Sequence, residues 1–194
     1  MDMKVIAFNG SPRRGGNTDI LLAETIRGAK EQGYETQVYQ LSTLSLKPCL
    51  NCGHCDATGR CIIQDDMQGI HDNIRSADRI IVASPIFFFS VSAQTKIMID
   101  RCQTFWAEKY VHKNPIRPGA VGRKGLLLLV GGMKKNDKNM GFACAEATVR
   151  AFFRTVNAQE HVTLAYDGVD EKGAIAKYPA ALTDAYEAGK ALVR

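Results

Sequence analysis

The chain has 194 residues, of which 45% are hydrophobic and 23% charged, and its formal net charge is +5. This composition excludes a disordered chain, and the lack of any run of about 18 apolar residues excludes a membrane-spanning helix. The basic residues are dispersed and form no nucleic-acid-binding motif, so the positive charge favours small anionic partners such as phosphorylated cofactors.

Strand-like and helix-like patterns alternate along the chain. Strands are predicted over residues 3–8, 36–41, 79–84, 125–132 and 161–166, and helices over residues 17–32, 66–76, 92–106, 141–156 and 179–193. Pro85 is expected to stop the third strand. This alternation predicts a single doubly wound α/β domain over residues 1–194, with a five-stranded parallel sheet and right-handed crossovers.

Ligands of such a sheet bind beyond the carboxyl ends of its strands, where the strand order switches. The loops at residues 9–18, 84–92 and 131–139 leave those ends. We therefore expect the functional residues in these three loops.

The first loop, "NGSPRRGGNTD", leads into the start of a predicted helix. A helix N-terminus favours phosphate, and this loop adds hydroxyl, amide and guanidinium groups from Ser11, Thr18, Asn17 and Arg13. The ending of an ATP-binding P-loop is absent, because Gly16-Asn17-Thr18 replaces Gly-Lys-Ser/Thr, and G-x-G-x-x-G does not occur. The loop fits one terminal phosphate monoester, as in FMN; the alternative is a polar turn that caps the helix.

Four of the six cysteines lie in one loop, residues 47–65, with the spacing C-x2-C-x2-C-x5-C: Cys49, Cys52, Cys55 and Cys61. Four thiolates at such short spacing suit a [4Fe–4S] cluster. Redox-active or free thiols and a zinc site are the alternatives, although zinc sites of four cysteines usually consist of two separated pairs. His54 in the loop could bind zinc or be solvated. Cys102 and Cys144 lie in helical patterns and are predicted to be small buried apolar residues.

The stretch "SPIFFFSVSAQTKIMIDR", residues 84–101, together with "NGSPRRGGNT", resembles the NADPH-dependent FMN reductase and iron-sulfur flavoprotein family. The cysteine loop, followed by Asp65, Asp66 and Met67, is also similar to that of the iron-sulfur flavoproteins. The resemblance reaches to about residue 132. It implies a flavodoxin-like fold with strand order 2-1-3-4-5.

The resemblance also implies which residues bind FMN. Those for the phosphate are Ser11, Arg13, Gly16, Asn17 and Thr18, and those beside the ring are Pro85, Ile86, Phe87, Phe88, Phe89, Ser90, Gly131 and Gly132. Phenylalanine rings offer flat apolar surface to a planar cofactor, although all three could instead belong to the core. Phe89 stands where relatives often have glycine, so it could narrow access to the flavin or stack on it. Lys134, Lys135 and Lys138 could attract a phosphorylated donor or an acidic protein, or simply be solvated.

These observations favour an FMN-binding oxidoreductase that transfers electrons between a [4Fe–4S] cluster and FMN, with NAD(P)H or a ferredoxin-type carrier as partner. One alternative is an NAD(P)H-dependent FMN or quinone reductase without a cluster. Another is a non-catalytic electron carrier or thiol redox sensor. The N-terminus has no signal-peptide pattern, so a cytoplasmic location is expected. The resemblance implies a homodimer or homotetramer.

Overall fold

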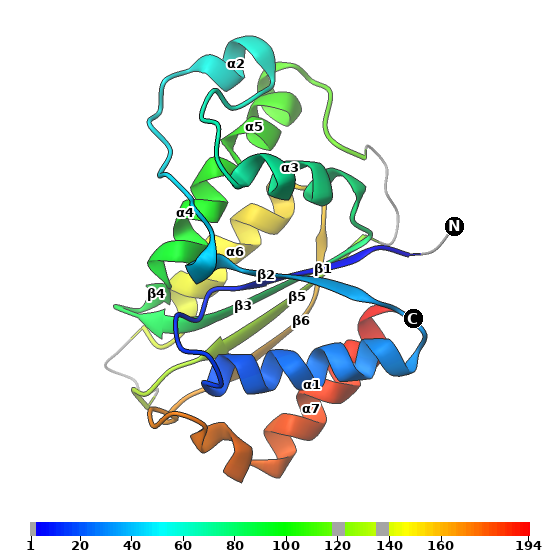
Figure 1. Ribbon diagram of the computed structural model, residues 1–194, viewed down its shortest axis with the longest axis vertical. Helices are drawn as coiled ribbons and strands as arrows, with labels where there is room; N and C mark the ends of the chain where they lie inside the picture. The colour runs from blue at the N-terminus through cyan, green and yellow to red at the C-terminus, as the bar shows by residue number, and fades with distance from the viewer. Residues whose placement is uncertain (1–2, 118–122, 135–139) are drawn as a thin grey trace.

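The computed structural model describes residues 3–117, 123–134 and 140–194. A central parallel sheet is formed by β1 (Val5–Asn9), β2 (Thr36–Gln40), β3 (Arg79–Phe87), β5 (Lys124–Val130) and β6 (Gln159–Tyr166). The strand order is β2-β1-β3-β5-β6 (Figure 1). A short strand, β4 (Ser90–Val91), pairs antiparallel with the end of β3. Apart from this extra strand, the predicted doubly wound order is confirmed.

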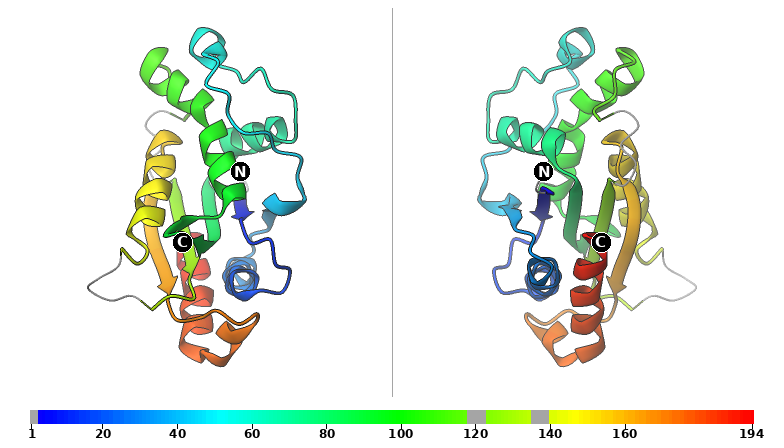
Figure 2. Two further views of the ribbon diagram at one scale, coloured as in Figure 1. Left: turned by 90° about the vertical axis from the view of Figure 1, so that its left-hand side faces the viewer. Right: turned by 90° about the vertical axis from the view of Figure 1, so that its right-hand side faces the viewer.

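Helices cover both faces of the sheet, which gives three layers (Figure 2). The helices α1 (Asn17–Glu31) and α7 (Pro179–Leu192) lie on one face. The other face carries α3 (Met67–Ser76), α4 (Ala93–Arg101) and α6 (Ala143–Thr155). The remaining helical segments are α2 (His54–Thr58), α5 (Gln103–Trp106), a π-helical turn (Ala107–Val111) and two 3-10 turns (Leu41–Thr43 and Ala174–Lys177).

Alternating apolar residues of the strands build two cores. On β1, Ile6 and Phe8 belong to the cluster under α3, α4 and α6, whereas Val5 and Ala7 belong to the cluster under α1 and α7. The same alternation continues along β3 and β5. Side chains of a strand point to opposite faces in turn, so a strand buried on both faces is apolar throughout.

Two glycines let α1 and α7 pack closely. A Cβ atom on Gly28 would overlap the Tyr186 carbonyl oxygen, and one on Gly189 would overlap the Thr25 carbonyl oxygen. The backbones of the two helices are therefore in direct contact. This contact fixes the position of α1, whose N-terminus forms one side of the candidate site described below.

Pro85 does not stop β3, which continues to Phe87. The Ala83 carbonyl accepts a hydrogen bond from Gly10 on the β1 side, and pairing with β1 ends at Ala83. Backbone groups of a strand alternate in direction, so the nitrogen of Pro85 also faces the β1 side, beyond the last pair. Proline has no backbone N–H, but at this position no hydrogen bond between β1 and β3 is lost.

Two further sequence predictions need correction. The helix predicted over residues 92–106 is divided at Cys102 into α4 and α5, because the Cys102 N–H bonds to the Ile99 carbonyl in a tighter turn. Cys144 is half-exposed, whereas Cys102 is buried as expected. Among the helices that the structure describes, none has the length and hydrophobicity needed to cross a bilayer.

Candidate functional site

The loop after β1 is folded tightly on itself at the N-terminus of α1. The Ser11 hydroxyl donates to the Arg13 carbonyl and accepts from the Arg13 N–H, both at 3.2 Å. The Asp19 carboxylate accepts from the Asn9 amide at 2.6 Å and from the Gly15 N–H at 2.7 Å. Gly15 has a φ of +66°, which suits glycine. These bonds preorganise the loop around the first turn of α1, where unpaired N–H groups favour an anion.

The side chain of Asn17, which was predicted to bind phosphate, forms hydrogen bonds with the segment after β6. Its amide nitrogen donates to the carbonyls of Val169 (3.3 Å) and Glu171 (2.9 Å), and its amide oxygen accepts from the Ile175 N–H (3.1 Å). These bonds join the first loop to the segment after β6. Both polar groups of the Asn17 side chain are therefore engaged by backbone groups of that segment.

The predicted FMN residues gather around two adjoining cavities. The polar cavity is lined by Ser11, Arg13, Gly16, Asn17, Thr18, Pro85, Ile86, Phe87 and Gly132. The apolar cavity, of about 320 Å³, shares Ile86, Phe87 and Gly132 and adds Phe88, Phe89 and Gly131. Ser90 lines neither cavity and instead pairs with Phe87 in the hairpin. Residues from three distant loops thus come together at one end of the sheet.

Sequence reasoning missed a fourth loop, which follows β6. Val169, Asp170 and Lys172 line the polar cavity. A Cβ atom on Gly15 would lie 3.8 Å from Cε of Lys172, so this lysine reaches the loop after β1. The rule that ligands bind beyond the carboxyl ends of parallel strands also applies to β6 and could have identified this loop. Met133, Gly141 and Phe142 were missed as well, and they line the apolar cavity.

The loops after β5 and β6 are bound to each other. The Gly131 N–H donates to the Tyr166 carbonyl at 2.9 Å, and the Val169 N–H donates to the Gly131 carbonyl at 3.0 Å. A Cβ atom on Gly132 would lie 2.9 Å from the Asp170 side chain, so only glycine fits there without a shift.

Of the three lysines predicted beside this loop, one can be placed. The Lys134 side chain packs against Gly168, in the segment after β6. Lys135 and Lys138 lie outside the described residues.

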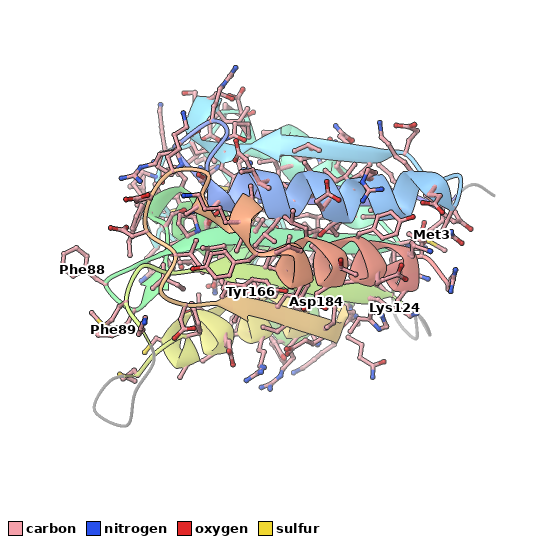
Figure 3. All side chains as sticks on the ribbon, turned by 90° about the horizontal axis from the view of Figure 1, so that it is seen from below. Met3, Phe88, Phe89, Lys124, Tyr166 and Asp184 are labelled. Atoms are coloured by element: carbon pink, nitrogen blue, oxygen red, sulfur yellow. The ribbon has the colours of Figure 1, made fainter. Side chains whose placement is uncertain are left out.

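Phe88 and Phe89 form the two-residue turn of the β3–β4 hairpin. Both have positive φ, +48° and +63°, as a type I′ turn requires. Glycine or asparagine normally occupies these positions, so both phenylalanines are strained. The Phe88 side chain is fully exposed and projects beyond the ribbon, while Phe89 is half-exposed beside it (Figure 3). Phe87 is 46% exposed. None of the three belongs to the core, so the core alternative is wrong.

The four loop cysteines line a single cavity, together with Arg101 and Thr104. Cys49 and Cys52 are exposed, whereas Cys55 and Cys61 are half-buried. Burial raises the pKa of the Cys55 thiol, and the negative charges of Asp56, Cys49 and Cys61 raise it further. Among the described residues, no three His, Cys, Asp or Glu side chains are arranged around one common metal-ion position.

Two aspartates hold together the two ends of the cysteine loop, residues 45–47 and 63–66, which we call its neck. The Asp66 carboxylate accepts from the Ser45 N–H at 2.7 Å, and the Asp65 carboxylate accepts from the Lys47 N–H at 2.9 Å. The Lys47–Asp65 bond therefore joins the two ends of the segment 47–65. The loop and α2 lie at the top of the molecule in Figure 1, beyond α4 and α5.

The helix α4 connects the two sites. It begins at its N-cap Ser92, directly after the hairpin, where the Ser92 N–H donates to the Ser84 hydroxyl at 2.9 Å. It ends at Arg101, which lines the cysteine cavity. Nine helical residues span about 14 Å. The two adjoining cavities and the cysteine cavity are thus at opposite ends of one short helix.

Comparison with known proteins places this arrangement in a family. The family model "NADPH-dependent FMN reductase" matches residues 3–160. The chain belongs to this family. Its class is therefore that of the flavin-dependent oxidoreductases. An iron-sulfur flavoprotein of Methanosarcina thermophila is 35% identical over 136 residues, which are 70% of this chain and 67% of that protein.

Other relatives match over shorter parts. An iron-sulfur flavoprotein of Methanocaldococcus jannaschii is 43% identical over 99 residues, so the match spans 51% of each protein. Among solved structures, an NAD(P)H:quinone oxidoreductase from Methanothermobacter marburgensis has a TM-score of 0.76 at 19% identity, covering 99% of this chain and all of that one. This last likeness shows a common fold.

Proposed function

We propose that the chain binds FMN in the two adjoining cavities and a [4Fe–4S] cluster in the cysteine cavity, and that it transfers electrons between them. The observation that carries this proposal is that all four loop cysteines line one cavity, joined through α4 to the aromatic hairpin of the other site. The name "iron-sulfur flavoprotein" of its relatives supports it.

The residues fit FMN because polar and apolar parts of the site are adjacent. The first turn of α1, Ser11, Arg13 and Lys172 supply donors and positive charge for a phosphate. The hairpin phenylalanines, with Gly131 and Gly132, supply flat apolar walls and close backbone approach for a planar ring. When bound, FMN exchanges a hydride or single electrons, whereas a cluster exchanges one electron at a time.

The fit to a cluster rests on the donor set and on its surroundings. Four cysteines line one cavity, whose lining also includes two buried polar side chains, Arg101 and Thr104, each with a donor atom that lacks a hydrogen-bond partner. The protein would hold the cluster through Cys49, Cys52, Cys55 and Cys61. A one-electron carrier of the ferredoxin type is the partner that this chemistry fits, and we also propose a homo-oligomer.

A second candidate is an NAD(P)H-dependent FMN or quinone reductase without a cluster. The apolar cavity of about 320 Å³ beside the hairpin favours it, because it offers room for a second planar molecule next to a flavin. This candidate predicts rapid loss of flavin absorbance when NADPH is added, in protein that contains no iron.

The test is the content of iron, acid-labile sulfide and FMN in protein purified without oxygen. We expect about four iron and four sulfide per FMN. Cys52→Ala should lose both iron and sulfide and retain FMN. Cys144→Ala is the control, because Cys144 lies outside the cysteine cavity, and it should retain all three. FMN without iron in the wild type would refute the cluster and leave the second candidate.

A further inference from the structure

Two side chains in the cysteine cavity carry buried donor atoms without a partner: Nε of Arg101 and the hydroxyl of Thr104. Arg101 is 1% exposed and Thr104 is 2% exposed. Five such buried atoms occur among the described residues, and two of them line this one cavity. Buried donors are normally paired, so two unpaired donors beside four thiols require an explanation.

The other donors of Arg101 are all used to close the neck of the loop. One terminal nitrogen donates to the Lys47 carbonyl at 2.8 Å and to the Asp65 carboxylate at 2.7 Å. The other donates to the Ile63 carbonyl at 3.2 Å and to the second Asp65 oxygen at 3.1 Å. A guanidinium has five N–H donors, and these bonds account for four of them. The Nε–H is the donor that remains.

Thr104 differs from three threonines in the longer helices α1 and α6. Thr25, Thr148 and Thr155 each donate their hydroxyl to the carbonyl four residues earlier, at distances from 2.8 to 3.0 Å. The corresponding bond is absent at Thr104, where the helix is divided between α4 and α5. Its hydroxyl is thus left without a partner, and Thr104 lines both the cysteine cavity and a second cavity between α3 and α5.

The charges around the cavity favour an anionic sulfur atom as the partner of these two donors. Among the described residues that line it, Arg101 is the permanent cation, beside four cysteines and Asp56. Cys61 and Arg101 both line this cavity. The sulfur atoms of the four cysteines in this lining can accept hydrogen bonds from the Arg101 Nε–H and the Thr104 hydroxyl.

We propose that Arg101 and Thr104 donate hydrogen bonds to the sulfur atoms held by the cysteine loop, and that they set the reduction potential of the metal centre. This inference rests on the proposed function. Donors to the sulfurs stabilise the more negative, reduced state, so they raise the potential. Arg101 also closes the loop neck, whereas Thr104 acts on the sulfurs alone. Both are positioning residues that act through the cysteines.

The cleaner test is Thr104→Val, which removes the hydroxyl and keeps the shape of the side chain. We expect iron and sulfide contents equal to those of the wild type and a reduction potential shifted to a more negative value. Thr104→Ser should restore the wild-type potential. Thr148→Val is the matched control, because the Thr148 hydroxyl donates within α6, and its potential should not move. Equal potentials for Thr104→Val and Thr148→Val would overturn the role of the hydroxyl.

Arg101→Lys tests the second function of the arginine. A lysine keeps the positive charge, but its single ammonium group cannot replace the planar guanidinium, which donates to Lys47, Ile63 and Asp65 and still has its Nε–H for the cavity. We expect faster amide hydrogen exchange over residues 47–65 in metal-free protein, together with a lower potential in loaded protein. Thr104→Val should leave the exchange unchanged. Unchanged exchange in Arg101→Lys would overturn the closing of the neck.

These measurements separate the inference from the proposed function. Wild-type protein without iron or sulfide would refute the cluster, and with it the sulfur-directed role of both residues. The hydrogen exchange of metal-free protein would still decide the role of Arg101 at the neck. Protein with iron and sulfide whose potential does not respond to Thr104→Val would refute the hydroxyl's role and leave the proposed function intact.

Discussion

Arg101 and Asp65 form a two-bond ion pair in which both side chains are almost completely buried, 0% and 2% exposed. Burial of Asp65 disfavours its charged form, but bonds from Arg101 and from the backbone N–H groups of Lys47 and Met67 prevail, so its pKa is lowered. The pair joins α4 to the neck of the cysteine loop. Through this pair, a long loop with little regular structure is attached to the helix at both of its ends.

Asp65→Asn should destabilise the protein by about 3–5 kcal/mol, because it leaves the buried guanidinium without its counter-charge. Urea unfolding measures the loss. Asp100→Asn is the control. Asp100 lies on α4 next to Arg101, but its ion pair with Lys96 is about half exposed, and such pairs contribute roughly 0–1 kcal/mol. Equal effects of the two substitutions would show that the buried pair has no special role.

His71 should make stability fall as the pH decreases below its ordinary pKa of 6.5. Burial, together with the positive charges of Arg101 and Arg75, lowers its pKa in the folded state, although the hydrogen bond to the Arg101 carbonyl (2.9 Å) opposes this shift. The unfolded chain therefore takes up a proton that the folded chain does not, and unfolding is favoured. His71→Gln should flatten the decline in stability between pH 7 and pH 5, measured by urea unfolding. An unchanged slope would exclude His71 as the cause.

Phe88→Asn should stabilise the fold by about 1 kcal/mol, because asparagine accepts the positive φ of the turn and the exposed ring is lost without loss of burial. Thermal unfolding of the FMN-free protein measures the gain. Phe87→Asn is the contrasting variant, since Phe87 lies in β3 and should gain nothing. A decrease in stability for Phe88→Asn would mean that the ring packs against another surface.

Arg13→Gln and Lys172→Gln should each weaken FMN binding about tenfold, which corresponds to roughly 1.4 kcal/mol, because each removes a positive charge from the polar cavity. Arg14→Gln is the control, since Arg14 is exposed and does not line the cavity. Titration of the apoprotein by flavin fluorescence gives the dissociation constants. Equal weakening by all three substitutions would indicate attraction by net charge alone.

The sheet and most of the flavin site could be predicted because they depend on local patterns. Apolar runs on β1, β3 and β5 are long and unambiguous, and parallel strands bring their following loops to one edge. The turn at Phe88 and Phe89 could not be predicted, because two phenylalanines disfavour the positive φ that the hairpin imposes. The role of Arg101 was hidden for another reason. Its partners, Lys47, Ile63 and Asp65, lie 36 to 54 residues away in the chain, and only tertiary packing brings them together.

Electron transfer between the two sites is the central claim, and rapid mixing tests it most directly. Anaerobic protein is mixed with a reduced ferredoxin-type carrier, and the loss of flavin absorbance is followed in the wild type and in Cys52→Ala. We predict fast loss in the wild type and a rate lowered by at least tenfold in Cys52→Ala, with FMN still bound. Equal rates in the two proteins would contradict the account, because electrons would then reach the flavin without the cysteine loop.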